Sequence, residues 1–133
     1  MASLYTIPEQ TKTTLKKFRL SSSRAGTFQA LVVKIASDHS IAVEDEPITS
    51  LDELAEELPD AAPRFVIVSY PLQKSDGRKV LPYVMLYYRP QTTTQENKMV
   101  YAGAVELVRN EAMVQKVIEL EDPDDLEELE EKL

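Results

Sequence analysis

The side chains that usually carry out chemistry in proteins are scarce in this sequence. His39 is its one histidine, and the 133 residues contain no cysteine. With that histidine in a predicted turn, we expect neither a catalytic triad nor a metal cluster built on histidine or cysteine. The three glycines, Gly26, Gly77 and Gly103, are too scattered to form a glycine-rich phosphate loop. The sequence therefore predicts a protein that is not an enzyme and holds no metal or cofactor.

Carboxylates are abundant but segregated. The formal net charge is −8, and residues 119–133 contain nine acids and one lysine, which account for all of it. These clusters lack the spacing of a calcium loop. They predict either a solvated helix face or a surface that orients the molecule on a protein partner. A nucleic-acid partner is disfavoured because the chain has no dense basic stripe interleaved with aromatic residues.

The length and the apolar pattern limit the class of protein. A chain of 133 residues predicts one domain, here 1–133, with a single core. No apolar run approaches the roughly 20 residues of a membrane span, and no signal-peptide pattern opens the sequence. Without cysteines the chain suits a reducing compartment. We expect a cytoplasmic monomer that does not bind membranes.

Residues 64–90 organise the predicted fold. The run RFVIVSY is apolar on both faces, as is the return run VLPYVMLYYRP, so we expect an antiparallel hairpin covered on both sides. Between them Asp76 and Gly77 provide the reversal, and Pro82 marks the entry of the second strand or a bulge.

The preceding segment predicts a flexible tail at 1–7, then a helix that begins at Pro8 with Thr11, Leu15 and Phe18 on its inner face. We expect a loop at 21–26, a strand at 28–36, a turn, and a short edge strand at 41–43. Ser50 and Glu53 predict a capping box for a short helix that ends at Pro59. Its inner stripe is Leu51, Leu54, Ala55 and Leu58.

After the hairpin, Thr93 and Glu96 predict a second capping box and the longest helix. Strand 117–120 follows, and Asp122 caps a last helix with Pro123 in its first turn. The long crossover makes the last two strands parallel. The inner stripe of the longest helix is predicted as Val100, Ala104, Leu107 and Val108, widened by Met99, Ala102, Val105 and Ala112. The last helix turns Leu126, Leu129 and Leu133 inward.

Three motifs resemble glia maturation factor, a branch of the actin-depolymerising factor/cofilin homology fold. They are LKKFRL at 15–20, LPDAAPRFVIVSY with KSDGRKVLPY at 58–83, and NKMVYAG at 97–103. The resemblance covers the chain from the first helix to the last. It implies an α/β (α+β) domain with a five-stranded mixed sheet of order 2-1-3-4-5, strands 4 and 5 parallel, and helices on both faces.

The resemblance also implies a function. Glia maturation factors bind the actin-related protein 2/3 complex, inhibit branched actin nucleation and promote debranching, with weak or indirect contact to actin at branch junctions. This implies a location at actin patches or the leading edge.

Two alternatives remain open. One is a cofilin-like protein that binds and severs actin, and the other is an adaptor that docks through its acidic last helix. The cofilin pattern is broken where cofilins carry bases on the long helix, because this chain has Val105, Asn110 and Glu111. Loss of bases from an actin-facing surface weakens its electrostatic attraction to actin.

The resemblance places two partner-binding surfaces on the chain. The first comprises the tail and one face of the long helix: Ser3, Leu4, Tyr5, Lys98, Met99, Tyr101, Ala102 and Arg109. The second is the hairpin tip: Lys74, Asp76, Arg78 and Lys79. Ser3 resembles a regulatory phosphorylation site of cofilins. A phosphate there would add about −1.5 to −2 charges, and Lys98 and Arg109 are its nearest predicted cations.

Overall fold

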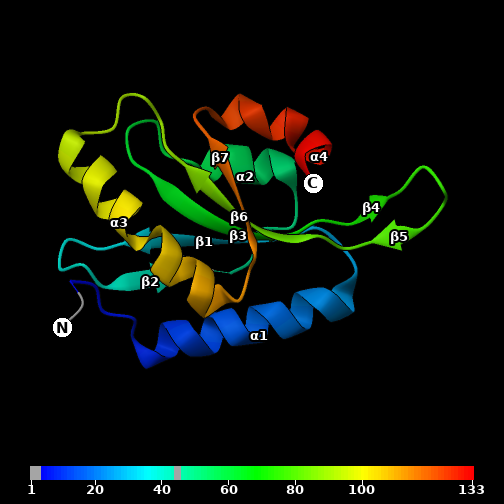
Figure 1. Cartoon of the computed structure of the whole chain (residues 1–133), viewed down its shortest axis with the longest axis horizontal. Coiled ribbons are helices and arrows are strands. Elements are labelled where there is room, and N and C mark those ends of the chain that lie inside the picture. Colours follow the sequence, from blue (N-terminus) through cyan, green and yellow to red (C-terminus); the bar gives the residue numbers. More distant parts are fainter. Residues whose placement is uncertain (1–3, 44–45) are drawn as a thin grey trace.

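A computed structural model describes residues 4–43 and 46–133, which form three layers with a sheet in the middle (Figure 1). The sheet has five strands in the order β2-β1-β3-β6-β7. All neighbours are antiparallel except β6 and β7, which are parallel. The predicted order, the edge position of the second strand and the parallel last pair are confirmed. The strands are β1 (Gln29–Ile35), β2 (Ile41–Val43), β3 (Arg64–Ser69), β6 (Tyr83–Tyr88) and β7 (Lys116–Leu120).

Helices cover both faces of this sheet because the central strands are apolar on both sides. Phe65 and Ile67 of β3 pack with residues of α1 (Glu9–Ala25) and α3 (Gln95–Ala112). Val66 and Val68 of the same strand pack on the opposite face with three shorter elements. These are α2 (Leu51–Glu57), the 3-10 helix η1 (Pro123–Glu128) and α4 (Leu129–Lys132).

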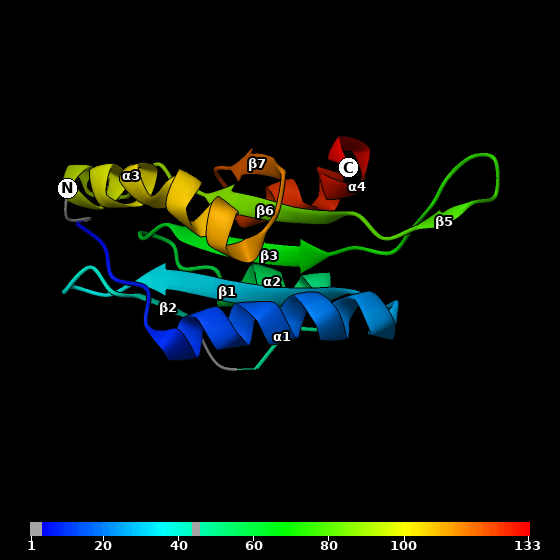
Figure 2. The ribbon, with the colours of Figure 1, turned by 60° about the horizontal axis from the view of Figure 1, so that its bottom comes forward.

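The central hairpin continues beyond the sheet as a narrow ribbon. β4 (Leu72–Gln73) and β5 (Lys79–Val80) pair antiparallel and project past the end of the sheet in both views (Figures 1 and 2). Gly77 has φ of 90° in the turn, as Asp76-Gly77 predicts. Pro82 precedes β6, where its carbonyl accepts a hydrogen bond from the Tyr70 amide at 3.0 Å. The two ribbon strands were not predicted, because each pairs only two residues.

The first helix is longer than its pattern predicts. The expected loop at 21–26 is wrong, since α1 continues to Ala25 and ends on Gly26, whose φ of 65° is left-handed. Ser22 is buried, and the hydroxyls of Ser21 and Ser22 donate to carbonyls three residues back in the helix. These bonds and the glycine cap extend a serine-rich segment that propensity alone disfavours.

The caps of the later helices differ in detail from the prediction. Thr94 caps α3 by accepting a hydrogen bond from the Asn97 amide, so the predicted Thr93–Glu96 box is wrong by one residue. Thr93 instead has a buried side chain, and its amide donates to the Pro90 carbonyl in a turn. The Asp122 cap is confirmed, with Asp125 completing a capping box. The last helix, however, begins as 3-10 rather than α.

Candidate partner-binding surfaces

The N-terminal segment contacts the rest of the fold from Tyr5 onward, which differs from the flexible tail expected for 1–7. Thr6 forms a parallel bridge with Ser40, its amide donating to the His39 carbonyl at 3.1 Å and its carbonyl accepting from the Ile41 amide at 2.8 Å. The segment runs along one end of the molecule, between the starts of α3 and α1 (Figure 2). Ser3 lies outside the described residues.

Tyr5 fastens this segment to the long helix. Its hydroxyl donates a hydrogen bond to the Val100 carbonyl at 2.6 Å, and its ring meets the His39 imidazole edge-on at 6.0 Å. Partial burial raises the pKa of the Tyr5 phenol. The phenol is therefore neutral at physiological pH and able to donate this bond.

The exposed part of the first predicted surface is apolar. Leu4 is 65% exposed and Met99 is 67% exposed, although Met99 was predicted to widen the buried stripe of α3. Ala102 is also exposed rather than buried, and Lys98 is half-buried at the same helix. The unbranched thioether of Met99 is suited to fill an irregular groove on a partner.

Tyr101 does not belong to this exposed set. It is 3% exposed and packs against Phe65 in the core. Its hydroxyl accepts a hydrogen bond from the Ile35 amide at 3.0 Å and lies 3.5 Å from the Arg64 guanidinium. Tyr101 therefore positions α3 on β1 and is not available to touch a partner. The helical spacing of Tyr101 with Ala104 and Val108, which are also buried, is the signal that predicts this.

Arg109 is engaged with Glu106 on its own helix and with Gln115 just beyond its end. Its guanidinium contacts the Glu106 carboxylate at 2.6 Å and the Gln115 carbonyl at 3.4 Å. A base held in this way presents less charge to an incoming partner, because the adjacent carboxylate offsets it. Glu106, exposed on α3, was missing from the predicted site. The Glu–Arg spacing of three residues on a helix is the signal that reveals it.

The second predicted surface is exposed at the ribbon tip. Lys74, Asp76, Arg78 and Lys79 are all exposed. Asp76 contacts the Arg78 guanidinium at 2.7 Å and accepts a hydrogen bond from the Arg78 amide at 3.0 Å, and both contacts lie within the turn at the tip. The tip and the start of α3 lie at opposite ends of the molecule (Figure 2). The chain therefore does not bring the two predicted surfaces together.

Within the described residues, no group of three or more His, Asp or Glu side chains is arranged to hold a metal ion. No described helix is long and apolar enough to cross a bilayer. The two surfaces can therefore act through their shape and charge. Known proteins resemble this chain in both sequence and fold.

The family model of cofilin/tropomyosin-type actin-binding proteins matches residues 4–133. Protein AIM7 of Saccharomyces cerevisiae is 44% identical over 146 aligned residues, covering 100% of this chain and 98% of AIM7. Glia maturation factor beta of Mus musculus is 37% identical, covering 90% of this chain and 85% of its own length. The family model and the AIM7 match extend through the described residues of both surfaces.

A solved structure agrees with the sequence relatives. The solution structure of glia maturation factor from Caenorhabditis elegans superposes with a TM-score of 0.81 at 36% identity, covering all of both chains. Proteins of this family regulate actin and are not enzymes. The chain belongs to the actin-depolymerising factor/cofilin family and, within it, resembles the glia maturation factors in sequence and fold.

Proposed function

We propose that this protein binds the actin-related protein 2/3 complex, inhibits branched actin nucleation and promotes debranching, in the cytoplasm at branched actin networks. The first surface, without Tyr101, contacts an actin-related subunit, and the ribbon tip contacts a second subunit. The proposal rests on membership of the family and on resemblance to the glia maturation factors along the whole chain.

One structural observation favours the complex over bare filaments. The middle and end of α3 present few free bases, since Arg109 is paired with Glu106 at 2.6 Å and Asn110 is exposed beside it. Val105 is half-buried where the cofilin pattern has a lysine. An apolar and nearly neutral helix face does not supply the attraction that a basic face offers to acidic actin.

The family model's description favours a second candidate function, because it names actin itself as the ligand. A cofilin-like protein would bind and sever filaments without the complex. The two functions are distinguished by imaging filaments assembled with the complex and filaments assembled without it. Our proposal predicts fewer new branches and faster loss of existing ones, with no severing of unbranched filaments. Severing of unbranched filaments at the same protein concentration supports the cofilin-like function instead.

A further inference from the structure

Three hollows meet around the C-terminal end of α1. One lies between α1, β6 and the end of α3, and is lined by Leu20, Leu81 and Met113. A second, of about 460 Å³, lies at the base of the ribbon and also includes Leu81. A third on the outer side of α1 also includes Leu20. The first two hollows share Leu81 and the first and third share Leu20, so the three lie side by side, and together we call them the α1–ribbon groove.

Leu20, Leu81 and Met113 give the floor of this groove an apolar part, beside the serines Ser22, Ser23 and Ser69. Among the described residues, four large apolar side chains are exposed, and they occur as two pairs. Leu4 and Met99 belong to the first surface, whereas Leu20, 44% exposed, and Met113, 64% exposed, both line the groove. Exposed apolar side chains that gather in one depression mark an interaction site more often than scattered ones do.

Met113 reaches the groove at a conformational cost. It ends α3 with φ of 59° and ψ of 42°, the left-handed conformation that glycine adopts most readily at this position of a helix. A methionine there is less stable than a glycine, because its Cβ crowds the backbone. Strain of this kind is retained where the side chain contributes to function, and here it holds a thioether over the groove.

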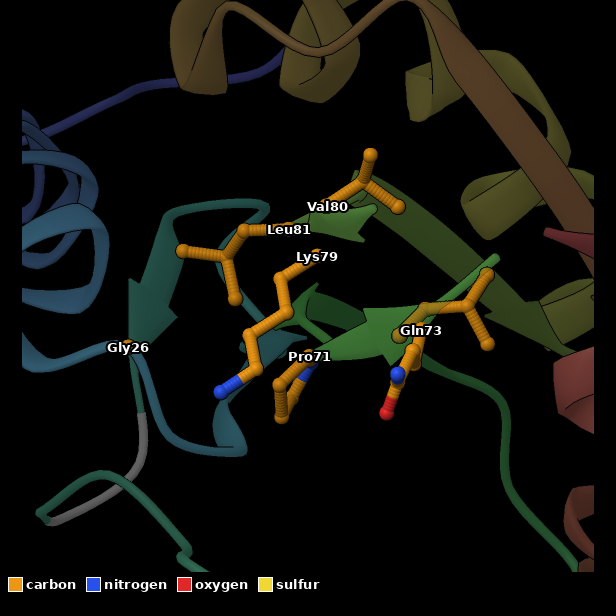
Figure 3. A pocket seen from close by; sticks show the side chains of 7 residues that line it. Gly26, Pro71, Gln73, Lys79, Val80 and Leu81 are labelled. Carbon is orange, nitrogen blue, oxygen red and sulfur yellow. The ribbon is translucent and has the colours of Figure 1, made fainter. Parts of the chain in front are cut away.

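The rim of the groove is basic. Lys17, Arg19, Arg24 and Lys79 line it, and no Asp or Glu is among its lining residues. In the parts of the chain that the structure describes, none of these four forms an ion pair. Figure 3 shows Lys79 and Leu81 extending from the ribbon toward Gly26 at the end of α1. The bases are therefore free to meet carboxylates around an apolar floor.

We propose that the α1–ribbon groove binds an acidic segment of a partner protein that carries apolar side chains. The apolar side chains occupy the floor at Leu20, Leu81 and Met113, and the carboxylates meet the bases of the rim. This site goes beyond the proposed function, because the exposed face of α3 is not part of it and Lys79 is the one residue that it shares with the predicted ribbon-tip surface.

The chain's own acidic segment is a poorer occupant. In residues 119–133 the leucines that would serve as anchors are already buried, with Leu126 at 3% and Leu129 at 0% exposure. A second copy of the chain could offer the groove carboxylates but not these apolar side chains. An anionic lipid surface offers charge but is too flat to enter a hollow between a helix and a ribbon.

The test uses the folded chain and an unbiased displayed library of peptides about 12 residues long. Selected peptides are expected to be net negative and to contain large apolar residues. Their Kd values are then measured with the wild type and with Arg24→Glu, and should weaken about tenfold or more in the variant and with rising salt. Lys16→Glu is the matched control, because it changes the same charge on the exposed side of α1 but does not line the groove. It should change the Kd of these peptides far less.

Met113→Gly is a second variant whose effect on binding cannot be caused by misfolding, because it is expected to be at least as stable as the wild type. Glycine relieves the left-handed strain, so this variant should melt at or above the temperature of the wild type while binding the selected peptides more weakly. A selection that yields neutral or basic peptides, or acidic peptides equally sensitive to Arg24→Glu and Lys16→Glu, overturns the proposal. So does self-association in sedimentation that Met113→Gly abolishes, or binding to vesicles of anionic lipid that the selected peptides do not displace. Self-association of this kind would point to a second copy of the chain as the occupant, and vesicle binding would point to a membrane.

Discussion

The phenol of Tyr5 occupies the space that a side chain at Gly103 would need. A Cβ atom built on Gly103 would lie 2.5 Å from the Tyr5 hydroxyl oxygen, far inside van der Waals contact. The same hydroxyl donates to the Val100 carbonyl at 2.6 Å. The absence of a side chain in the middle of α3 therefore allows the N-terminal segment to lie on this helix at Tyr5, the neighbour of the exposed Leu4.

Gly103→Ala is expected to weaken binding to the actin-related protein 2/3 complex without destabilising the fold. Alanine stabilises a helix interior by up to about 1 kcal/mol relative to glycine, but its methyl group displaces Tyr5 and shifts Leu4. We expect an affinity loss of about threefold to tenfold, since only part of the first surface moves. Binding is measured by titration with the complex, and stability by thermal unfolding.

A double variant separates this effect from a change in the helix itself. In a Tyr5→Ala background there is no phenol to displace, so Gly103→Ala should cause little further loss of affinity. If the two losses simply add, the contact between Tyr5 and position 103 is not the cause.

The sequence predicts the fold well because its signals are redundant. Val66 and Phe65 belong to a run that is apolar on both faces, which requires helices on both sides, and the long crossover before Ile118 makes the last pair parallel. The predicted helix ends are wrong where a single local hydrogen bond determines the residue at which the helix begins or ends. The end of α1 depends on the buried Ser22 and on the cap at Gly26. The start of α3 depends on whether the hydroxyl of Thr93 or that of Thr94 accepts the hydrogen bond of a backbone amide, here that of Asn97.

The predicted site is less complete than the fold. Tyr101 belongs to a motif that resembles the family, but its phenol is turned into the core, where periodicity places it. The pairing of Arg109 with Glu106 depends on side-chain rotamers, and the role of Gly103 depends on a segment 98 residues earlier in the chain. A contact between residues as far apart in the chain as Tyr5 and Gly103, unlike the Glu106–Arg109 spacing, leaves no periodic signal in a single sequence.

Phosphorylation of Ser3 is expected to weaken binding to the complex. A phosphate adds about −1.5 to −2 charges next to Leu4, which is exposed at the first surface. Because Arg109 is already paired, Lys98 is the remaining base of that surface for it to meet. Affinity of enzymatically phosphorylated protein is compared with that of the unmodified form at two salt concentrations. Equal affinity under both conditions removes Ser3 from the interface.

The ribbon tip is expected to contribute more to debranching than to initial binding. Lys74→Ala with Arg78→Ala removes two exposed bases that do not line the α1–ribbon groove. We expect the affinity to change by less than about threefold, while branches dissociate several times more slowly at saturating protein. Branch lifetimes are measured by microscopy. A collapse of affinity with a normal dissociation rate at saturation contradicts this assignment.

We expect the burial of Tyr83 to make the folded state less stable at alkaline pH. Burial raises the pKa of its phenol to about 12, although the nearby Arg19 lowers it somewhat, and its hydroxyl donates to the Ala112 carbonyl at 3.2 Å. The unfolded phenol titrates near 10. The stabilisation is therefore complete below pH 10 and is lost as the pH rises toward 12, because only the unfolded state releases the proton in that window.

Tyr83→Phe is the measurement for this effect. Above pH 10 the free energy of unfolding should fall more steeply for the wild type than for Tyr83→Phe, by up to about 2 kcal/mol. The other titratable groups are the same in both proteins, so their contribution cancels in the comparison. Parallel curves for the two proteins would show that Tyr83 ionises as easily in the folded state as in the unfolded one.

The central claim is that this protein recognises the actin-related protein 2/3 complex in preference to actin filaments. The direct measurement is its affinity for the purified complex and for bare filaments in one buffer at about 0.15 M salt, where exposed charges act over roughly 8 Å. Met99→Ala serves as the surface variant, because Met99 is 67% exposed on α3. The account predicts that the Kd for the complex is at least about tenfold lower than the Kd for bare filaments. It also predicts that Met99→Ala raises the Kd for the complex. Equal co-sedimentation with bare filaments contradicts it.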